Sequence, residues 1–307
     1  MEPFSFPRYL AAKRSVDDRA LNPRVWAALA ARLRSRESSQ PLRVLEIGAG
    51  TGTMIARMAE NGLLDNAHVH ALDAEEENIA AARAELAQWG RERGCAVDET
   101  ESGLRLSAEG FALEITLEAG DLFAFLPRHE GQPAWDLVVA NAFLDLVDIP
   151  ALLPRLRRLA RPGGLFYFSI NFDGVTALEP QIDAHLDDEI MRLYHRSMDE
   201  RVTGGRLSGD SRAGRHLFQH MREASYGILA AGSSDWLVWA RGGVYPADEA
   251  YFLHCILHFF EDTLRGCPEI SAADLDAWLE ARRGQIRRGE LVYMAHQLDF
   301  LAQAGGE

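Results

Sequence analysis

The chain has 307 residues, of which 47% are hydrophobic and 25% charged, close to the composition of an ordinary globular protein. That apolar content is enough for a core, which excludes a chain that is disordered throughout. The formal net charge of −14 repels phosphate backbones and anionic lipid. We therefore expect neither nucleic acid nor a membrane among its partners. Cys95, Cys255 and Cys267 are odd in number and widely spaced, which favours a reducing, cytoplasmic compartment over a disulfide framework.

Hydrophobic periodicity and turn signals predict alternating strands and helices along the chain. The predicted helices cover 24–36, 53–60, 75–89, a stretch ending at 160, then 181–200, 217–224, 247–264 and 271–288. The predicted strands cover 42–47, 67–72, a hairpin over 104–117, then 135–140, 164–170, a strand around 236–239 and a last one from about 291. Such alternation predicts an α/β fold with a parallel sheet and helices on its faces.

We expect one α/β domain over residues 41–307, preceded by a helical segment over 1–40. That segment carries Tyr9, Lys13 and Asp17, and it could form a lid or a surface helix. The alternation stops after Asn171 and resumes near Leu217, so residues 172–212 are predicted to be an insertion that covers a substrate and stays outside the sheet. An insertion after the fifth strand opens onto the crevice where α/β sheets bind ligands.

The loop Gly48-Ala49-Gly50-Thr51-Gly52 joins a strand to a helix, where glycines let the backbone approach a ligand. Its G-x-G-x-G spacing differs from the dinucleotide fingerprint G-x-G-x-x-G, and it lacks the Lys-Ser/Thr of a P-loop. Asp73 ends the second strand and could accept both hydroxyls of a ribose. Asp121 ends the third and could accept from an adenine amino group. For each, a solvated acid at a strand end is the alternative.

Val44-Leu45-Glu46-Ile47 and the glycine loop together resemble the first motif of class I S-adenosylmethionine-dependent methyltransferases. The chain also resembles later motifs of that family, in the family's order, at Asp73, Gly120-Asp121-Leu122, residues 135–139 and residues 159–164. The resemblance is strong over 40–171 and looser over 217–300, and it indicates no subfamily. It implies a Rossmann-like, seven-stranded, mostly parallel sheet with helices on both faces and an antiparallel last strand.

The resemblance also implies S-adenosyl-L-methionine as the cofactor and a methyltransferase activity of the EC 2.1.1.- class. The residues expected to bind the cofactor are Glu46, Gly48, Ala49, Gly50, Gly52, Asp73, Asp121, Leu122 and Asn141. Glu46 could instead cap backbone amides in the core. We expect methyl transfer to an oxygen or nitrogen atom of a small-molecule acceptor, which requires in-line alignment and, for some acceptors, a base.

The stretch Asn141-Ala142-Phe143-Leu144-Asp145 follows the fourth strand and should lie beside the transferred methyl. It lacks the prolines of the motif that relatives methylating nucleic acids or glutamine carry here. The expected catalytic residues are Asn141, Asp145 and His216, with capping of the next helix as the alternative for Asp145. The expected substrate-binding residues are Phe143, Asn171, Tyr194, Arg212 and Arg215.

Arg212 and Arg215 could clamp a carboxylate or phosphate on the acceptor. The alternative is a loop that enters a helix, with Asp210 or Ser211 as its cap. No metal is expected: His254 and His258 have helical i, i+4 spacing, but no third ligand is recognisable. Two other functions stay open, a dinucleotide-dependent oxidoreductase and a non-catalytic scaffold that binds S-adenosylmethionine. The G-x-G-x-G spacing counts against the first, and the intact glycines and acids count against the second.

Overall fold

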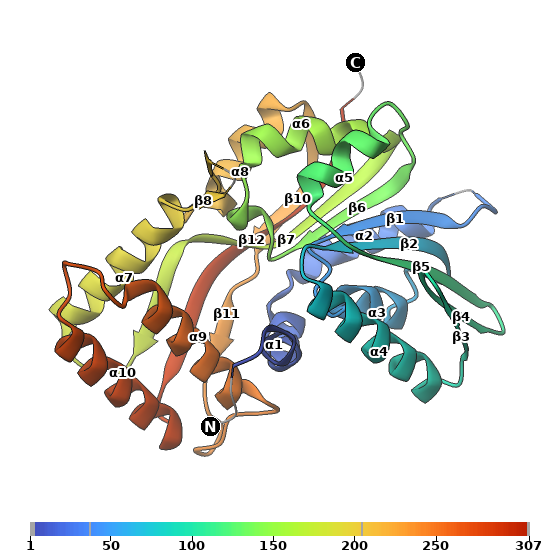
Figure 1. Cartoon of the computed structure of the whole chain (residues 1–307). Helices are drawn as coiled ribbons and strands as arrows, with labels where there is room; N and C mark the ends of the chain where they lie inside the picture. The colour runs from blue at the N-terminus through green and yellow to red at the C-terminus, as the bar shows by residue number, and fades with distance from the viewer. Residues whose placement is uncertain (1–3, 37, 204, 306–307) are drawn as a thin grey trace.

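Figure 1 shows the computed structural model of the chain, which describes residues 4–36, 38–203 and 205–305. The helices are α1 (Phe6–Ala20), α2 (Pro23–Arg34), α3 (Thr53–Glu60), α4 (Glu76–Glu92), α5 (Leu122–His129), α6 (Ile149–Leu159), α7 (Ala184–Asp199), α8 (Ala213–Glu223), α9 (Glu249–Leu264) and α10 (Ala272–Arg287), with a 3-10 turn η1 (Leu144–Leu146). The strands are β1 (Leu42–Ile47), β2 (Asn66–Asp73), β3 (Ala96–Thr100), β4 (Gly103–Ala108), β5 (Phe111–Ala119), β6 (Trp135–Asn141), β7 (Ala160–Glu179), β8 (Val202–Thr203), β9 (Arg206–Leu207), β10 (Tyr226–Ser233), β11 (Trp236–Val238) and β12 (Val292–Ala304). None of the helices described here is long and apolar enough to span a bilayer.

One large sheet organises the chain in the order β10-β12-β7-β6-β1-β2-β5-β4-β3, with β11 paired to β12. Strands β1, β2, β5, β6 and β7 pair in parallel, and β12 runs antiparallel between β7 and β10. The mostly parallel sheet and its antiparallel last strand confirm the expected fold class. The sheet has ten strands and not seven, because the hairpin β3–β4 extends one edge and β11 joins the other side.

Helices cover both faces of this sheet, so each strand buries alternate residues in two separate cores. Val44 and Val139 point into the core under α2, α3 and α4, and this core continues to α1, α7, α9 and α10. Leu45 and Val138 point into the opposite core, which α5, α6 and α8 cover. Burial on both faces explains why these strands are apolar almost without interruption.

Strand β7 is much longer than the predicted strand over 164–170, because it runs on to Glu179. Phe172 pairs with Gln297, and Glu179 pairs with Val292, so the extension lies against the first half of β12. Residues 172–179 therefore belong to the sheet, and the expectation that the whole of 172–212 lies outside it is wrong for these eight residues. The segment that leaves the sheet begins at Pro180.

The sixth core strand is β10, and the expectation of a strand around 236–239 identified only the short β11. The β10 sequence Tyr226–Ser233 is rich in Gly and Ala, which have low strand propensity, so its pattern is weak. It lies at the edge of the sheet, where only alternate side chains are covered.

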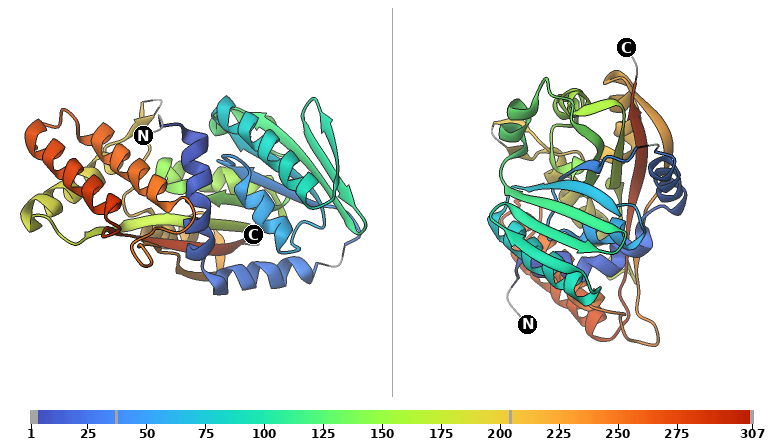
Figure 2. Two further views of the ribbon diagram at one scale, coloured as in Figure 1. Left: turned by 90° about the horizontal axis from the view of Figure 1, so that it is seen from below. Right: turned by 90° about the vertical axis from the view of Figure 1, so that its right-hand side faces the viewer.

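The projecting ends of β7 and β12 carry a helical cover made of α7, α9 and α10. Asp187 of α7 accepts hydrogen bonds from Trp278 (2.6 Å) and from the buried guanidinium of Arg282 (2.5 Å), both on α10. Burial opposes ionisation of Asp187, but the hydrogen bonds from Trp278, the Ile182 N–H and Arg282 bring its pKa below the usual value. These bonds join α7 to α10, and α1 packs between α9 and α4 (Figure 2).

Candidate functional site

A cavity of about 1080 Å³ lies at the carboxyl ends of β1, β2 and β6. Its wall is formed by the glycine loop and these strand ends on one side, and by α1, α7, α9 and the projecting parts of β7 and β12 on the other. Ligand pockets usually measure about 300–1,000 Å³. This volume has room for two small molecules at once, in the crevice where open α/β sheets bind ligands.

The glycine loop has no room for larger residues at three positions, because the side chains of Phe143, Leu10 and Leu86 pack against it. The φ angles of Gly48, Gly50 and Gly52 are +64°, +54° and +78°, which disfavour any other residue. A Cβ atom on Gly48 would lie 2.5 Å from the Phe143 ring, and one on Gly50 would lie 2.8 Å from Leu10 of α1. The N-terminal helix thus closes directly over the loop.

Asp73, at the end of β2, holds the glycine loop through its carboxylate. Its Oδ2 accepts the Gly50 N–H at 2.8 Å, and its Oδ1 accepts from the Glu75 N–H and the Asn78 amide, both at 3.0 Å. The Oδ1 of Asn78 is buried and has no hydrogen-bond partner among the described residues. Both side chains line the cavity, so an acceptor pair is available there for hydroxyl groups of a ligand.

Asp121 lines the same wall and begins α5, where its Oδ1 accepts the Ala124 N–H at 2.9 Å. Its side chain is exposed and keeps its other oxygen available. The capping role and the expected ligand contact are therefore compatible.

Glu46 lies buried at the end of β1 and also faces the cavity. Burial raises the pKa of its carboxyl to about 8, with Asp73 adding to the rise and Arg57 opposing it. Arg57 is itself paired with Asp18 of α1 at 2.6 Å. Glu46 is therefore protonated at neutral pH in the free protein, and a cationic ligand group beside it would favour its ionised form.

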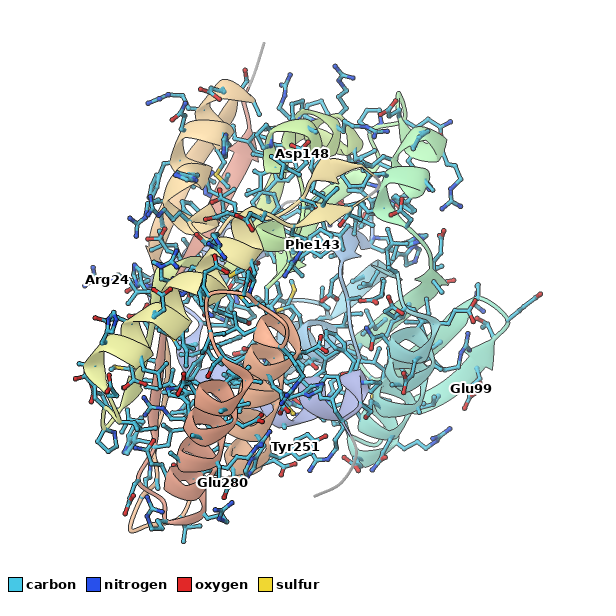
Figure 3. All side chains as sticks on the ribbon, turned by 60° about the vertical axis from the view of Figure 1, so that its left-hand side comes forward. Arg24, Glu99, Phe143, Asp148, Tyr251 and Glu280 are labelled. Atoms are coloured by element: carbon cyan, nitrogen blue, oxygen red, sulfur yellow. The ribbon has the colours of Figure 1, made fainter. Side chains whose placement is uncertain are left out.

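Most of the residues expected to bind a cofactor meet on this one wall. Those that line it are Glu46, Gly48, Ala49, Gly50, Asp73, Asp121, Leu122 and Asn141. Gly52 lies just behind the wall, where a Cβ would meet Leu86 at 2.6 Å. Asn141 accepts a hydrogen bond from Ser169 at 2.9 Å. Phe143 follows β6 and lies toward the middle of the molecule, whereas Glu99 and Glu280 lie at its outer edge (Figure 3).

Asp145 reaches the cavity from the η1 turn, beside Tyr194 of α7. Burial raises the pKa of Asp145 to about 6, Arg201 and Lys13 oppose the rise, and Asp210 adds to it. Burial and the charge of Asp145 raise the pKa of Tyr194 to about 12, against the opposing charge of Arg201. The helix cap suggested for Asp145 is in fact Asp148, whose Oδ1 accepts the Ala151 N–H at 3.1 Å.

Four of the residues expected in catalysis or substrate binding do not line the cavity: Asn171, Arg212, Arg215 and His216. Asn171 is fully buried in β7 and donates to the Leu298 carbonyl at 2.8 Å. Arg215 forms an ion pair with Asp173 at 2.8 Å, and Arg212 is exposed at the start of α8. Their helix packs on the sheet face that α5 and α6 cover, so these side chains point away from the wall.

The structure also identifies cavity residues that sequence reasoning missed. Arg201, which follows α7, lines the wall, and its guanidinium makes no hydrogen bond or ion pair with any described residue. The Oε1 of Gln297 in β12 is buried without a partner within the described chain. Aromatic rings complete this half of the wall, from Phe6, Tyr9, Phe172, Tyr194, Trp236, Phe259 and Tyr293. In the sequence, these segments are recognisable only by their aromatic and basic residues. That composition does not indicate which way the side chains point.

Lys13 and Asp17 of α1 form a buried ion pair at the cavity wall. Asp17 also accepts from the Trp236 indole N–H at 2.9 Å. The bond from Trp236 joins the N-terminal helix to β11, and α1 forms part of the cavity wall. The second helix of the N-terminal segment, α2, packs instead against β10 and β12.

Residues 45–166 match the family model described as a methyltransferase domain. Comparison with curated proteins found no match. Among solved structures, a SAM-dependent methyltransferase from Methanosarcina mazei is 13% identical, with 88% of this chain and 95% of that chain covered and a TM-score of 0.44.

Geranyl diphosphate C-methyltransferase from Streptomyces coelicolor A3(2) is 12% identical, with coverage of 92% and 78% and a TM-score of 0.39. The cyclopropane synthase MmaA2 from Mycobacterium tuberculosis is 11% identical, with coverage of 91% and 83% and a TM-score of 0.42. Similarity at this level gives no information on what this chain acts upon.

The raised pKa of Glu46 predicts a pH-dependent cost in stability. Between its ordinary pKa of 4.5 and about 8, the folded state holds a proton that the unfolded state has released. Folding stability therefore falls as pH rises through this window, by at most about 1.4 kcal/mol per pH unit. In Glu46→Gln this cost is absent, so its melting temperature should exceed that of the wild type by a margin that grows from pH 5 to pH 8.5. Parallel curves for the two proteins would contradict the assignment, and exposed Glu109→Gln is the matched control.

Proposed function

We propose that this chain, whose residues 45–166 match the methyltransferase-domain family model, transfers the methyl group of S-adenosylmethionine to an oxygen or nitrogen atom of a small acceptor. We further propose that the acceptor has an apolar body and an anionic group. The observation that carries the proposal is one cavity with two differently lined halves. A backbone-rich wall with strand-end acids faces a compartment of aromatic rings that also holds Asp145 and Arg201.

The residues of the first half fit the cofactor by their chemistry. Asp73 and the unpartnered Oδ1 of Asn78 offer acceptors to the ribose hydroxyls, and Asp121 offers one to the adenine amino group. Gly48 and Gly50 contribute backbone atoms to the cavity wall, and Glu46 can balance positive charge. When bound, the cofactor supplies an electrophilic methyl carbon on a sulfonium.

The second half supports a small acceptor that is mainly apolar. Phe172, Trp236 and Tyr293 give it flat, rigid walls, and Gln297 adds an unsatisfied acceptor oxygen. Arg201 is the cation there without a partner among described residues, so it is suited to a carboxylate or phosphate. We therefore assign to Arg201 the anion-binding role that was expected of Arg212 and Arg215.

Asp145 is our candidate for the general base. With a pKa of about 6, it is mostly ionised at pH 7, yet it is basic enough to accept a proton from a hydroxyl or ammonium as that group is methylated. Arg201 and Lys13 act on its charge from the same cavity wall. Asn141, at the end of β6, lies between the two halves and would orient the reacting groups. The three free cysteines support a reducing compartment such as the cytoplasm.

Asp73→Ala should lower the affinity for S-adenosylhomocysteine more than tenfold. It removes charge-assisted hydrogen bonds that are worth about 1.5–3 kcal/mol. Calorimetric titration of wild type and variant measures this, and Asp65→Ala, just before the opposite end of β2, is the control that should bind normally. If the wild type binds a nicotinamide dinucleotide and not S-adenosylhomocysteine, the chain is a dinucleotide enzyme and the proposal is wrong.

Asp145→Asn should slow methyl transfer by a factor on the order of 10²–10⁴, the usual contribution of a positioned base. The assay follows S-adenosylhomocysteine release with the best acceptor from a panel of hydroxylated and amino-substituted aromatic carboxylates. The acid limb of the wild-type pH profile, near pH 6, should be absent from the variant. The control is Asp148→Asn, which removes a carboxylate at the start of α6, keeps an oxygen that can cap the helix, and should keep the acid limb. An unchanged profile in Asp145→Asn would rule out this base.

Arg201→Met should raise KM for an anionic acceptor about tenfold or more and leave its uncharged amide analogue unaffected, because only the anion loses a charge-assisted bond. The matched control is Arg192→Met, whose guanidinium pairs with Glu189 on the exposed side of α7. Equal KM changes for both acceptors would show that Arg201 does not recognise the anion.

A further inference from the structure

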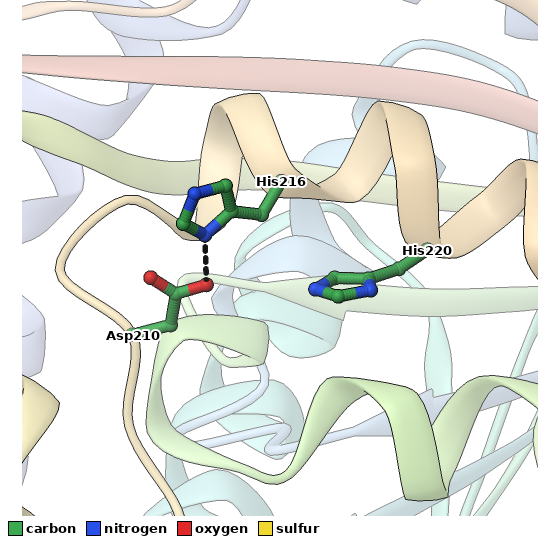
Figure 4. A group of neighbouring side chains, drawn as sticks. All are labelled: Asp210, His216 and His220. Atoms are coloured by element: carbon green, nitrogen blue, oxygen red, sulfur yellow. Dashed lines mark hydrogen bonds and ion pairs between the residues drawn. The ribbon is translucent and has the colours of Figure 1, made fainter.

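A second group of candidate ligands lies outside the cavity, where the chain enters α8. The side chains of Asp210, His216 and His220 each offer one ligand atom, and these atoms lie within 4.8 Å of one another (Figure 4). In the part of the chain that the structure describes, this is the only group of three such residues. None of the three lines the cavity.

The backbone prepositions all three side chains. His216 and His220 are separated by one helical turn, so their rings lie on the same face of α8. Asp210 is held in the preceding turn, where its Oδ1 accepts the Arg212 N–H at 2.9 Å. Its Oδ2 lies 2.7 Å from His216 Nδ1 (Figure 4).

The His220 ring directs its Nε2 atom toward Asp210 and His216, so this nitrogen is available to an ion in the group (Figure 4). Its Nδ1 lies on the other side of the ring, 3.9 Å from the Glu223 carboxylate. The side chains of His216 and Asp210 are 47% and 21% exposed, so an ion and a water ligand can enter from solvent.

We propose that Asp210, His216 and His220 bind a single Zn²⁺ ion. Two imidazoles and one carboxylate are a known ligand set for zinc, with water in the fourth position. Bonds of about 2.0–2.2 Å require only small side-chain rotations from the present spacing. Mg²⁺ and Ca²⁺ prefer oxygen ligands and should not bind here.

The ion would act on the site through the backbone of the turn that holds Asp210. The Asp210 N–H donates to the carbonyl of Asp145 at 3.3 Å, so this turn supports the η1 segment at the cavity wall. An ion shared by the turn and α8 would reinforce the bonds that already join them, from the Ala213 N–H to the Asp210 carbonyl and between Asp210 and His216. We assign it a stabilising role, and we place no reaction step on it.

The test is calorimetric titration of the chelator-treated, full-length protein with Zn²⁺ and separately with Mg²⁺. We expect one Zn²⁺ per chain, no heat of binding with Mg²⁺, and a higher melting temperature with Zn²⁺. His216→Asn and Asp210→Asn should each weaken Zn²⁺ binding about tenfold or more. Co²⁺ as a probe should give the visible absorption of a tetrahedral nitrogen–oxygen site in the wild type, and His216→Asn should lose it.

The matched control is His258→Asn, which removes one member of the other i, i+4 histidine pair, on α9. It should bind Zn²⁺ as the wild type does. The proposal is overturned if the wild type takes up no Zn²⁺. It is also overturned if folded His216→Asn and Asp210→Asn retain wild-type affinity, or if His258→Asn alone loses it.

Discussion

The hydrogen bond from the Gly50 N–H to the Asp73 carboxylate is the constraint on which the site depends. It joins the loop after β1 to the end of β2, and it fixes a backbone whose glycines have left-handed φ angles. Phe143 and Leu10 then pack where side chains on Gly48 and Gly50 would lie. The loop thereby sets the positions of the end of strand β6 and of the N-terminal helix α1. These two segments lie where the cofactor half of the cavity meets the acceptor half.

The acceptor half is assembled from segments that are far apart in the sequence. The long pairing of β7 with β12 provides its floor and projects beyond the parallel sheet. On this projection, α7 and α10 are joined through Asp187, Trp278 and Arg282. Helix α1 closes the remaining side, where the bond from Trp236 to Asp17 holds it to β11.

The cofactor wall could be predicted from the sequence, but the acceptor wall could not. Glu46, Gly50 and Asp73 lie in short strand–loop–helix units. In such units the local sequence pattern determines both the type of element and the direction in which its side chains point. The extension of β7 depends on pairing with β12, which lies more than 100 residues away, so its polar sequence resembles a loop. Arg215 looked suited to a substrate, yet Asp173 binds it, since the buried face of α8 determines where its charged residues point.

The most direct test is a crystal structure of the protein with S-adenosylhomocysteine. We expect the ribose at Asp73, the adenine beside Asp121, and the sulfur directed past Asn141 toward Asp145 and Arg201. We also expect the acceptor half of the cavity to stay open to a second ligand. A ligand bound outside this cavity, or one whose sulfur points away from Asp145, would contradict the account.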